Sequence, residues 1–273
     1  MKKSRAQFER TYFLIKLLRG GKDAPVDESG PRAIADAHAP PRVFRYHILC
    51  ALQLSSMTKD QKVHEAMNTL KKYGLTVENI AKTSIEHLEE MIKPVGFYRR
   101  KSVYMRDTAN ILIEKHGGEV PNNIESLIEL PGIGPKMAHI TLSEAYGITE
   151  GIGVDSHMHR ICNQLGWVTS KTPEETQAQL ESFIPREEWG KINHEIVGLG
   201  QMLQQPIYRV RLAQALLAIE DEIDFQESFS LLKRLGFVMG SIAKVDESLH
   251  SEIENRVLKV KRPRKFEEHT FKQ

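Results

Sequence analysis

Residues 130–138 read LPGIGPKMA and lie in the most informative segment of the sequence, 124–147. Helical segments at 124–130 and 136–146 flank it. The two glycines, Gly132 and Gly134, permit positive φ and leave no side chain over the turn. Successive backbone N–H groups around Ile133 can then point outward beside a helix start, where an anion is stabilised. The stretch predicts a helical hairpin that binds a nucleic-acid phosphate; a plain turn between two helices is the alternative.

Two ionisable residues, one in this hairpin and one in a later loop, are candidate catalytic residues. Lys136 begins the second helical segment, where partial burial and the positive helix end both favour a neutral amine over an ammonium. A neutral lysine amine is a nucleophile and forms Schiff bases. Asp155, in the stretch GIGVDSH at 151–157, precedes another helix and would move a proton or stabilise positive charge. The alternatives are a surface lysine on phosphate and a plain N-cap.

The rest of the chain is also helical in pattern. Apolar residues recur at helical spacing in 61–74, 84–93 and 105–116, and no stretch alternates as a strand does. Hydrophobic residues make up 40% and charged residues 27% of the chain, which is typical of globular proteins. The apolar runs are far shorter than the ~20 residues of a membrane span. We therefore expect an all-α protein without a membrane partner.

Charge and cysteine content limit the kinds of partner and of metal or disulfide site that the chain can have. The formal net charge is +2, so only local clusters of basic residues can indicate a nucleic-acid partner. The chain has two cysteines, Cys50 and Cys162, which excludes a disulfide framework and any site of three or four thiolates. One basic cluster is Arg99-Arg100-Lys101; the other comprises Lys259, Lys261, Arg262, Arg264 and Lys265. The second is typical of a nuclear import signal or a DNA-binding arm, with a solvated tail as the alternative.

The stretches at 130–138 and 153–157 together resemble the helix-hairpin-helix–GPD superfamily of DNA glycosylases, and most closely the eukaryotic endonuclease III homologues. Shorter matches at 54–60, 94–98 and 197–201 extend the similarity over about residues 44–206. The resemblance implies two helical domains with double-stranded DNA in the cleft between them. It also implies excision of oxidised pyrimidines and cleavage at abasic sites. The lysine matching Lys136 attacks the deoxyribose C1′ and forms a Schiff base that undergoes β-elimination, while Asp155 assists.

The resemblance also implies which residues contact DNA. Phe97 matches a wedge that fills the gap left by a flipped nucleotide, and Arg99, Arg100 and Lys101 follow it. A core aromatic is the alternative for Phe97. Met57 stands where the family usually has a glutamine, and methionine cannot hydrogen-bond an orphaned base. We therefore expect weaker discrimination of the opposite base.

The sequence departs from the family where many members bind a four-iron four-sulfur cluster through cysteines. The matching positions carry Gln204, Arg211, Gln214 and Glu220, so we expect no cluster and no other cofactor. Apolar residues at 212, 216 and 219 suggest helix packing in its place. We also expect no metal at His139, His157 or His159.

We expect four segments. Residues 1–43 form an N-terminal helix and linker that pack with the second domain, and 44–149 form a six-helix domain with the hairpin. Residues 150–221 form the second helical domain, and 222–273 form a loosely attached, variable tail with one or two short helices. The first 22 residues are basic, as in a transit peptide, but an ordinary first helix is favoured.

The expected function is that of a bifunctional DNA glycosylase and abasic-site lyase. We expect a monomer in the nucleus, with the mitochondrion as a second location. The alternative is a catalytically impaired protein that binds lesions or serves as a scaffold without turnover. A monofunctional relative is disfavoured, because such relatives usually lack the lysine.

Overall fold

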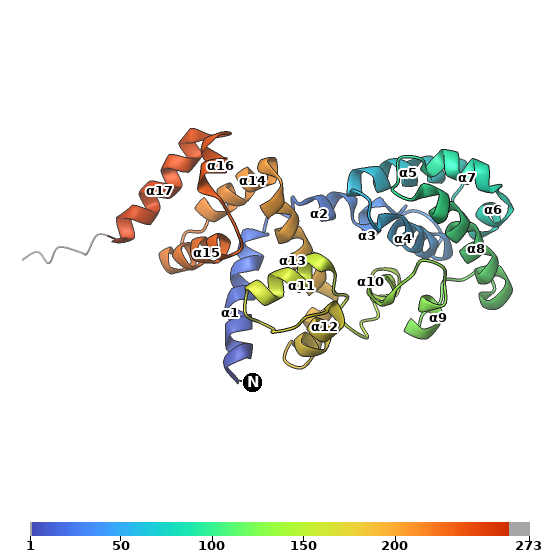
Figure 1. The fold of residues 1–273 in the computed structure, drawn as a ribbon, viewed down its shortest axis with the longest axis horizontal. Helices are drawn as coiled ribbons and strands as arrows, with labels where there is room; N and C mark the ends of the chain where they lie inside the picture. Colours follow the sequence, from blue (N-terminus) through green and yellow to red (C-terminus); the bar gives the residue numbers. More distant parts are fainter. Residues whose placement is uncertain (1, 262–273) are drawn as a thin grey trace, which may run out of the picture.

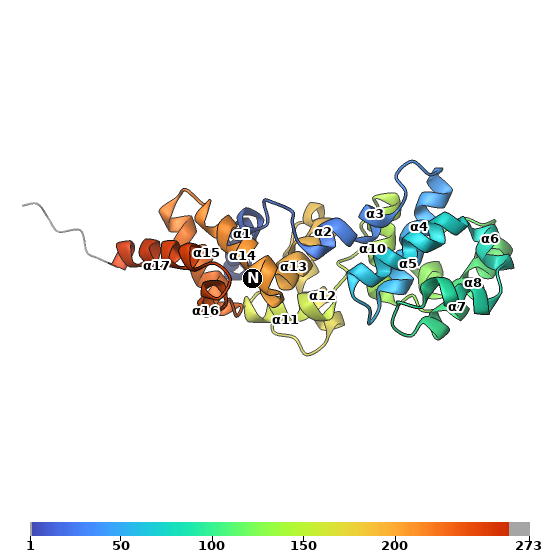
Figure 2. The ribbon, with the colours of Figure 1, turned by 90° about the horizontal axis from the view of Figure 1, so that it is seen from above.

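The computed structural model describes residues 2–261, and helices are the only regular secondary structure in that range. The predicted all-α fold is therefore confirmed. Two helical lobes lie along the long axis of the molecule (Figure 1), and the view from above separates them in the same way (Figure 2). Among the described residues, no helix is both long and apolar enough to cross a membrane.

The first lobe, termed the hairpin lobe, is built from apolar helix faces that meet in one core. On the helix at 60–73, for example, Val63, Met67 and Leu70 are buried, as their spacing predicts. Its helices are α3 (Pro31–Ile34), α4 (Pro41–Ser55), α5 (Asp60–Tyr73), α6 (Val77–Lys82), α7 (Ile85–Ile92), α8 (Tyr98–His116), α9 (Ile124–Ile128) and α10 (Pro135–Tyr146).

The second lobe, termed the terminal lobe, joins the start of the chain to its later helices around a separate core. Phe8 packs edge-on against Trp167 with ring centroids 4.9 Å apart, so the basic first segment is a structural helix. The helices are α1 (Lys2–Leu18), α2 (Pro25–Ser29), α11 (Ser156–Gln164), α12 (Pro173–Glu181), the 3₁₀ turn η1 (Arg186–Glu188), α13 (Trp189–Gln204), α14 (Pro206–Leu217), α15 (Glu222–Arg234), α16 (Met239–Ala243) and α17 (Glu247–Lys261).

The segment 24–43, expected as a linker, divides between the two lobes. Ala24 is buried in the core of the terminal lobe, whereas Ile34 is buried in the core of the hairpin lobe. The chain therefore crosses between the lobes near Gly30, earlier than the expected boundary at residue 43. It crosses back between Ile148, which packs on the hairpin-lobe core, and Ile152, which is buried in the terminal lobe.

The C-terminal region differs from the loosely attached tail that we expected. Helices α15 to α17 pack on the terminal lobe, and Phe225, Leu232 and Ile253 are fully buried in its core. These apolar residues recur at helical spacing among many charged ones, and the charge obscured the pattern. Arg262, Arg264 and Lys265 of the second basic cluster lie outside the described residues.

Candidate active site

Lys136 and Asp155 lie side by side although they belong to different lobes. Lys136 follows Pro135 in the first turn of α10, and Asp155 is the N-cap of α11. The Lys136 Nζ donates to Asp155 Oδ2 at 3.3 Å, while Asp155 Oδ1 accepts from the backbone N–H of Met158 at 2.7 Å. One carboxylate oxygen therefore caps the helix and the other faces the amine.

Lys136 is partly buried, as the sequence analysis expected. Its side chain is 38% exposed, against 14% for that of Asp155. The Asp155 carboxylate, in contact with the amine, is positioned to take a proton from it.

The loop before Asp155 is fixed on several sides. The backbone N–H of Ile152 donates to Glu181 Oε1 at 2.8 Å, and Asn193 Nδ2 donates to the Gly153 carbonyl. A Cβ on Gly151 would lie 2.5 Å from His139 Cε1 and 2.9 Å from Gln177 Nε2, so a side chain there would displace these neighbours. The sequence does not point to Glu181 or Asn193, because a single polar residue on a helix carries no signal of its partner.

Two of the three histidines considered as metal ligands, His139 and His159, hydrogen-bond to protein side chains. His139 Nε2 accepts from Gln177 Nε2 at 3.2 Å, and His159 Nδ1 lies 2.6 Å from Thr176 Oγ1. Burial lowers the pKa of His139, which favours its neutral form. Within residues 2–261, no group of three or more His, Cys, Asp or Glu side chains is arranged to bind a metal ion.

The pair opens into a cleft of about 1400 Å³ that is lined by both lobes. Met57 and Asp60 line it from the hairpin lobe, and Asn193 and Gln201 line it from the terminal lobe. Gln201 of the terminal lobe joins the two lobes, because its Nε2 donates to Asp60 Oδ2 of the hairpin lobe at 2.7 Å. Its Oε1 accepts from the Val26 N–H, within the terminal lobe, at 2.9 Å. Burial raises the pKa of Asp60, while the Gln201 hydrogen bond opposes that rise. The Asp60–Gln201 contact was not anticipated from the sequence.

The hairpin turn depends on its glycines for two different reasons. Gly132 has φ of +78°, and a Cβ there would lie 2.6 Å from the Tyr104 ring. A Cβ on Gly134, the N-cap of α10, would meet nothing within 4 Å, so packing does not require this glycine. The absence of a side chain leaves the backbone at the start of α10 open to a ligand.

Two backbone groups of the turn are already hydrogen-bonded within the protein. The Ile133 side chain is buried and its N–H donates to the Leu130 carbonyl at 3.1 Å, so this donor is used within the turn. Gln53 Nε2 donates to the Pro131 carbonyl at 2.6 Å and fastens the turn to α4. Gln53 was missed in the sequence analysis, because a buried glutamine in an apolar helix resembles a surface residue in the sequence.

Met57 and Phe97 both lie at the surface on turns. Met57 is 82% exposed and Phe97 is 65% exposed, so Phe97 is not the core aromatic that was the alternative. Both have positive φ, +52° for Met57 and +58° for Phe97, which is rare for residues with a side chain. Arg99 and Arg100 are exposed just after Phe97.

Lys101 requires a correction, because the structure does not leave it free for DNA. The residue is 4% exposed, and its Nζ donates to the carbonyls of Leu54 at 2.8 Å and Ser56 at 2.6 Å. A third bond reaches Thr58 Oγ1 at 3.0 Å. The helical spacing of Lys101 with Met105 and Leu112 placed it on the buried face of α8.

The residues at the iron–sulfur positions do not fit a cluster. Arg211 Nη1 donates to the Asp23 carbonyl at 2.9 Å, and Gln214 and Glu220 are exposed. The two cysteines of the chain, Cys50 and Cys162, are buried in different lobes. Four thiolate ligands are therefore not available to this part of the fold.

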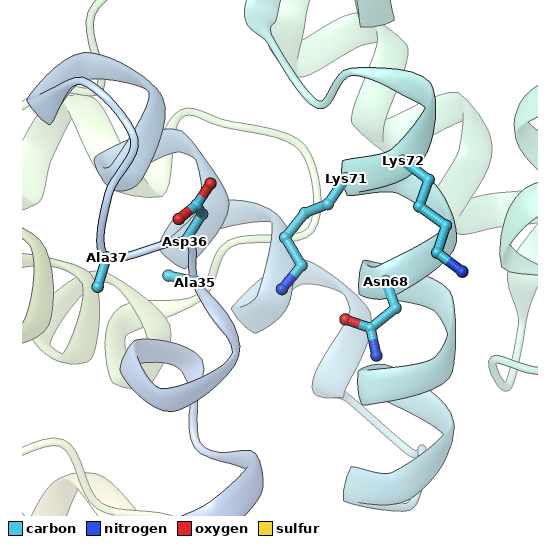
Figure 3. A pocket seen from close by; sticks show the side chains of 6 residues that line it. All are labelled: Ala35, Asp36, Ala37, Asn68, Lys71 and Lys72. Atoms are coloured by element: carbon cyan, nitrogen blue, oxygen red, sulfur yellow. The ribbon is translucent and has the colours of Figure 1, made fainter.

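A smaller cavity of about 480 Å³ lies in the hairpin lobe and shares no lining residue with the cleft. Figure 3 shows Lys71 extending toward the Ala35–Ala37 segment, while Lys72 points away. The Lys71 Nζ donates to the Ile34 carbonyl at 2.7 Å, so its charge serves the packing of α3 against α5. The cleft with Lys136 and Asp155 is the stronger candidate for an active site.

Comparisons with known proteins identify the family of the chain. Residues 50–186 match the HhH-GPD superfamily of base excision DNA repair proteins. Endonuclease III-like protein 1 of Mus musculus is 45% identical over 196 residues, which cover 71% of this chain and 65% of the relative. The Gallus gallus protein of that name is 46% identical over 195 residues, covering 71% and 69%. The chain thus spans about two thirds of the length of these relatives.

A solved structure of a non-covalent endonuclease III–DNA complex is similar in fold. Its TM-score is 0.59 and its sequence identity is 28%, over 70% of this chain and 84% of that chain. The family match at residues 50–186 includes the hairpin and the loop that carries Asp155. The chain therefore belongs to the endonuclease III family of the HhH-GPD superfamily of base excision DNA repair proteins.

Proposed function

We propose that this protein is a bifunctional DNA glycosylase and abasic-site lyase that acts as a monomer on duplex DNA containing oxidised pyrimidines. The observation that carries the proposal is the contact of 3.3 Å between the Lys136 amine and the Asp155 carboxylate in the cleft. An amine that attacks carbon must first lose a proton, and a carboxylate in hydrogen-bond contact accepts it.

The chemistry follows from this pair. Asp155 takes the proton, and the Lys136 Nζ forms a bond to C1′ of a flipped nucleotide while the C1′–N bond to the base breaks. The departing base takes up the proton held by Asp155. The nitrogen now bound to C1′ passes a proton to O4′ as the C1′–O4′ bond breaks, which opens the sugar ring and leaves an iminium on Lys136. Loss of a C2′ proton then expels the 3′ phosphate, and water releases the lysine.

The surrounding residues support a duplex substrate. The open backbone at Gly134 and the start of α10 suits a phosphate. The exposed tips of Met57 and Phe97 suit the space that a flipped nucleotide leaves in the stack. Arg99 and Arg100 would add phosphate contacts beside them, whereas Lys101 is withdrawn from this surface.

The test is borohydride trapping on a duplex that contains thymine glycol or an abasic site. We expect the wild type to give a covalent protein–DNA adduct, because reduction converts the iminium into a stable amine. Lys136→Gln serves as the control and should give no adduct while it still binds the duplex. Wild-type protein that binds normally but forms no adduct and releases no base would contradict the proposal.

That last result would favour a second candidate function, a lesion-binding protein without turnover. The observation in its favour is that the iron–sulfur positions carry Gln204, Arg211, Gln214 and Glu220. The trapping experiment separates the two candidates, because both predict binding and only the glycosylase predicts an adduct.

A further inference from the structure

The buried ammonium of Lys101 joins two turns that are far apart in the sequence. An ammonium has three N–H donors, and here each is directed at a protein oxygen. The acceptors are the carbonyls of Leu54 and Ser56 and the hydroxyl of Thr58, at 2.8, 2.6 and 3.0 Å. All three acceptors belong to the segment 54–58, so they surround Met57 on both sides. Lys101 therefore fixes the backbone that presents Met57.

The same residue is also tied to the turn that presents Phe97. The Lys101 N–H donates to the Phe97 carbonyl at 3.1 Å in the first turn of α8. Thr58 Oγ1 connects the turns a second time, because it accepts from the Gly96 N–H at 3.1 Å. A Cβ on Gly96 would lie only 2.5 Å from the Met57 carbonyl oxygen. The two turns are thus in direct contact.

The conformations at the two tips need such support. Met57 and Phe97 are two of the three described non-glycine residues with positive φ. Residues with a side chain keep that conformation only where the surroundings hold them in it. Burial lowers the pKa of Lys101 to about 8, which still leaves most of the amine charged at pH 7 with its three donors intact.

We propose that Lys101 is a positioning residue, which clamps the turns of Met57 and Phe97 so that both tips enter DNA at a fixed spacing. The clamp comprises Lys101, Thr58 and Gly96. The proposal rests on the proposed function, since it assigns these tips to a duplex with a flipped nucleotide. It makes Lys101 necessary for opening the duplex and not for the bond to C1′.

The experiment compares lyase rates on an abasic site in duplex DNA and in single-stranded DNA. Lys101→Met keeps the length of the side chain and removes its donors. We expect the lyase rate on duplex DNA to fall by about tenfold to a hundredfold, because the residues that position the substrate are misplaced. The lyase rate on single-stranded DNA should stay within about twofold of the wild type. Thr58→Val removes one hydroxyl and should lower the duplex rate in the same way. Lys115→Met, an exposed lysine on the same helix, is the matched control.

A second measurement does not depend on turnover. A duplex carrying a tetrahydrofuran abasic analogue with 2-aminopurine opposite it reports unstacking by a rise in fluorescence. We expect binding of the wild type to raise the fluorescence and binding of Lys101→Met to raise it much less, at saturating protein. A full rise with Lys101→Met and Thr58→Val would overturn the clamp.

The outcomes separate this proposal from the proposed function. Equal losses on single-stranded and duplex DNA would mean that Lys101 merely maintains the fold, and would overturn a positioning role. A wild type without lyase activity on either substrate would contradict the proposed function alone. In that case the fluorescence result still decides whether Lys101 sets the two tips.

Discussion

Asp155 has two roles in the site that a single substitution can separate. Asparagine can cap α11 as aspartate does, but it cannot accept a proton from Lys136. We expect Asp155→Asn to lower the single-turnover rate of base release by about 100-fold or more while thermal stability is retained. Rapid-quench measurement of base release, with circular dichroism melting as the control, checks this. A rate within a few-fold of the wild type would exclude Asp155 as the proton acceptor.

Met57 is the residue at which we expect specificity to differ from the family. Its exposed side chain lines the cleft and can fill space but has no strong hydrogen-bonding group for an orphaned base. We expect Met57→Gln to separate the excision rates opposite the four bases more widely than the wild type does. Excision rates measured in the four duplexes test this. Equally wide separation in both proteins would refute the expectation.

At the residue scale, the sequence singled out Lys136 and Asp155, which the structure places in contact, but not the residues that hold them. Lys136 and Asp155 lie in motifs whose glycines and helix starts can be identified from the sequence alone. Gln53 and Asn193 have no such context, because their partners are distant backbone carbonyls. Lys101 followed two exposed arginines and was grouped with them. Its spacing of four from Met105 was the signal that it belonged to the buried face.

Among the elements, α17 is joined to the end of α14 by Arg256. The Arg256 guanidinium of α17 stacks on Phe225 at 4.0 Å and donates to the carbonyls of Leu217 and Ile219, near the end of α14. We expect Arg256→Met to destabilise the protein by about 2 kcal/mol, because charged donors to buried carbonyls are lost. Urea unfolding checks this, with the exposed Lys259→Met as control. Equal stability of the two variants would show that Arg256 does not fasten α17.

The junction of α1, α2 and α13 is held by a buried ion pair whose effect depends on pH. Asp27 accepts from Arg19 at 2.8 Å and lies 2.7 Å from His194 Nε2. Burial alone would raise the pKa of Asp27, but the Arg19 guanidinium and the Ala24 N–H outweigh it and hold the pKa below its usual value. Its contribution to stability is therefore present above the unfolded pKa of about 4 and lost as the pH falls through the folded value.

We accordingly expect Asp27→Asn to destabilise the protein by about 3 kcal/mol at pH 7, since it removes the charge of the nearer of two carboxylates on the buried Arg19 guanidinium, Glu195 being 3.7 Å away. The difference from the wild type should shrink as the pH is lowered below about 4. Denaturant unfolding from pH 3 to pH 7 measures it, with the neighbouring exposed Glu28→Gln as the control. A difference that is constant over this range would contradict the assignment to Asp27.

The helices themselves were predictable where apolar spacing is regular, as in α5 and α8. The C-terminal helices were underestimated, because their apolar residues are widely spaced and are separated by charges. Phe225 and Leu232 of α15 and Ile253 of α17 are all buried in the core of the terminal lobe, which the sequence did not reveal. Packing between distant segments therefore decided the structure of this region.

On the scale of the whole molecule, the site exists because two lobes meet. Lys136 comes from the hairpin lobe and Asp155 from the terminal lobe, and Gln201 joins the lobes through Asp60. The sequence indicated two domains through family resemblance. It could not show where the chain crosses, because the crossing near Gly30 depends on which core buries Ala24 and Ile34.

Peptide mapping of the borohydride-reduced adduct by mass spectrometry tests the central claim most directly. If the amine in the cleft is the nucleophile, the reduced sugar remnant will be found on the peptide that contains Lys136, and on no other lysine. The Lys136→Gln variant supplies the matched blank. A remnant on Lys59, Lys101 or the N-terminal amine, with Lys136 unmodified, would contradict the assignment of the active site.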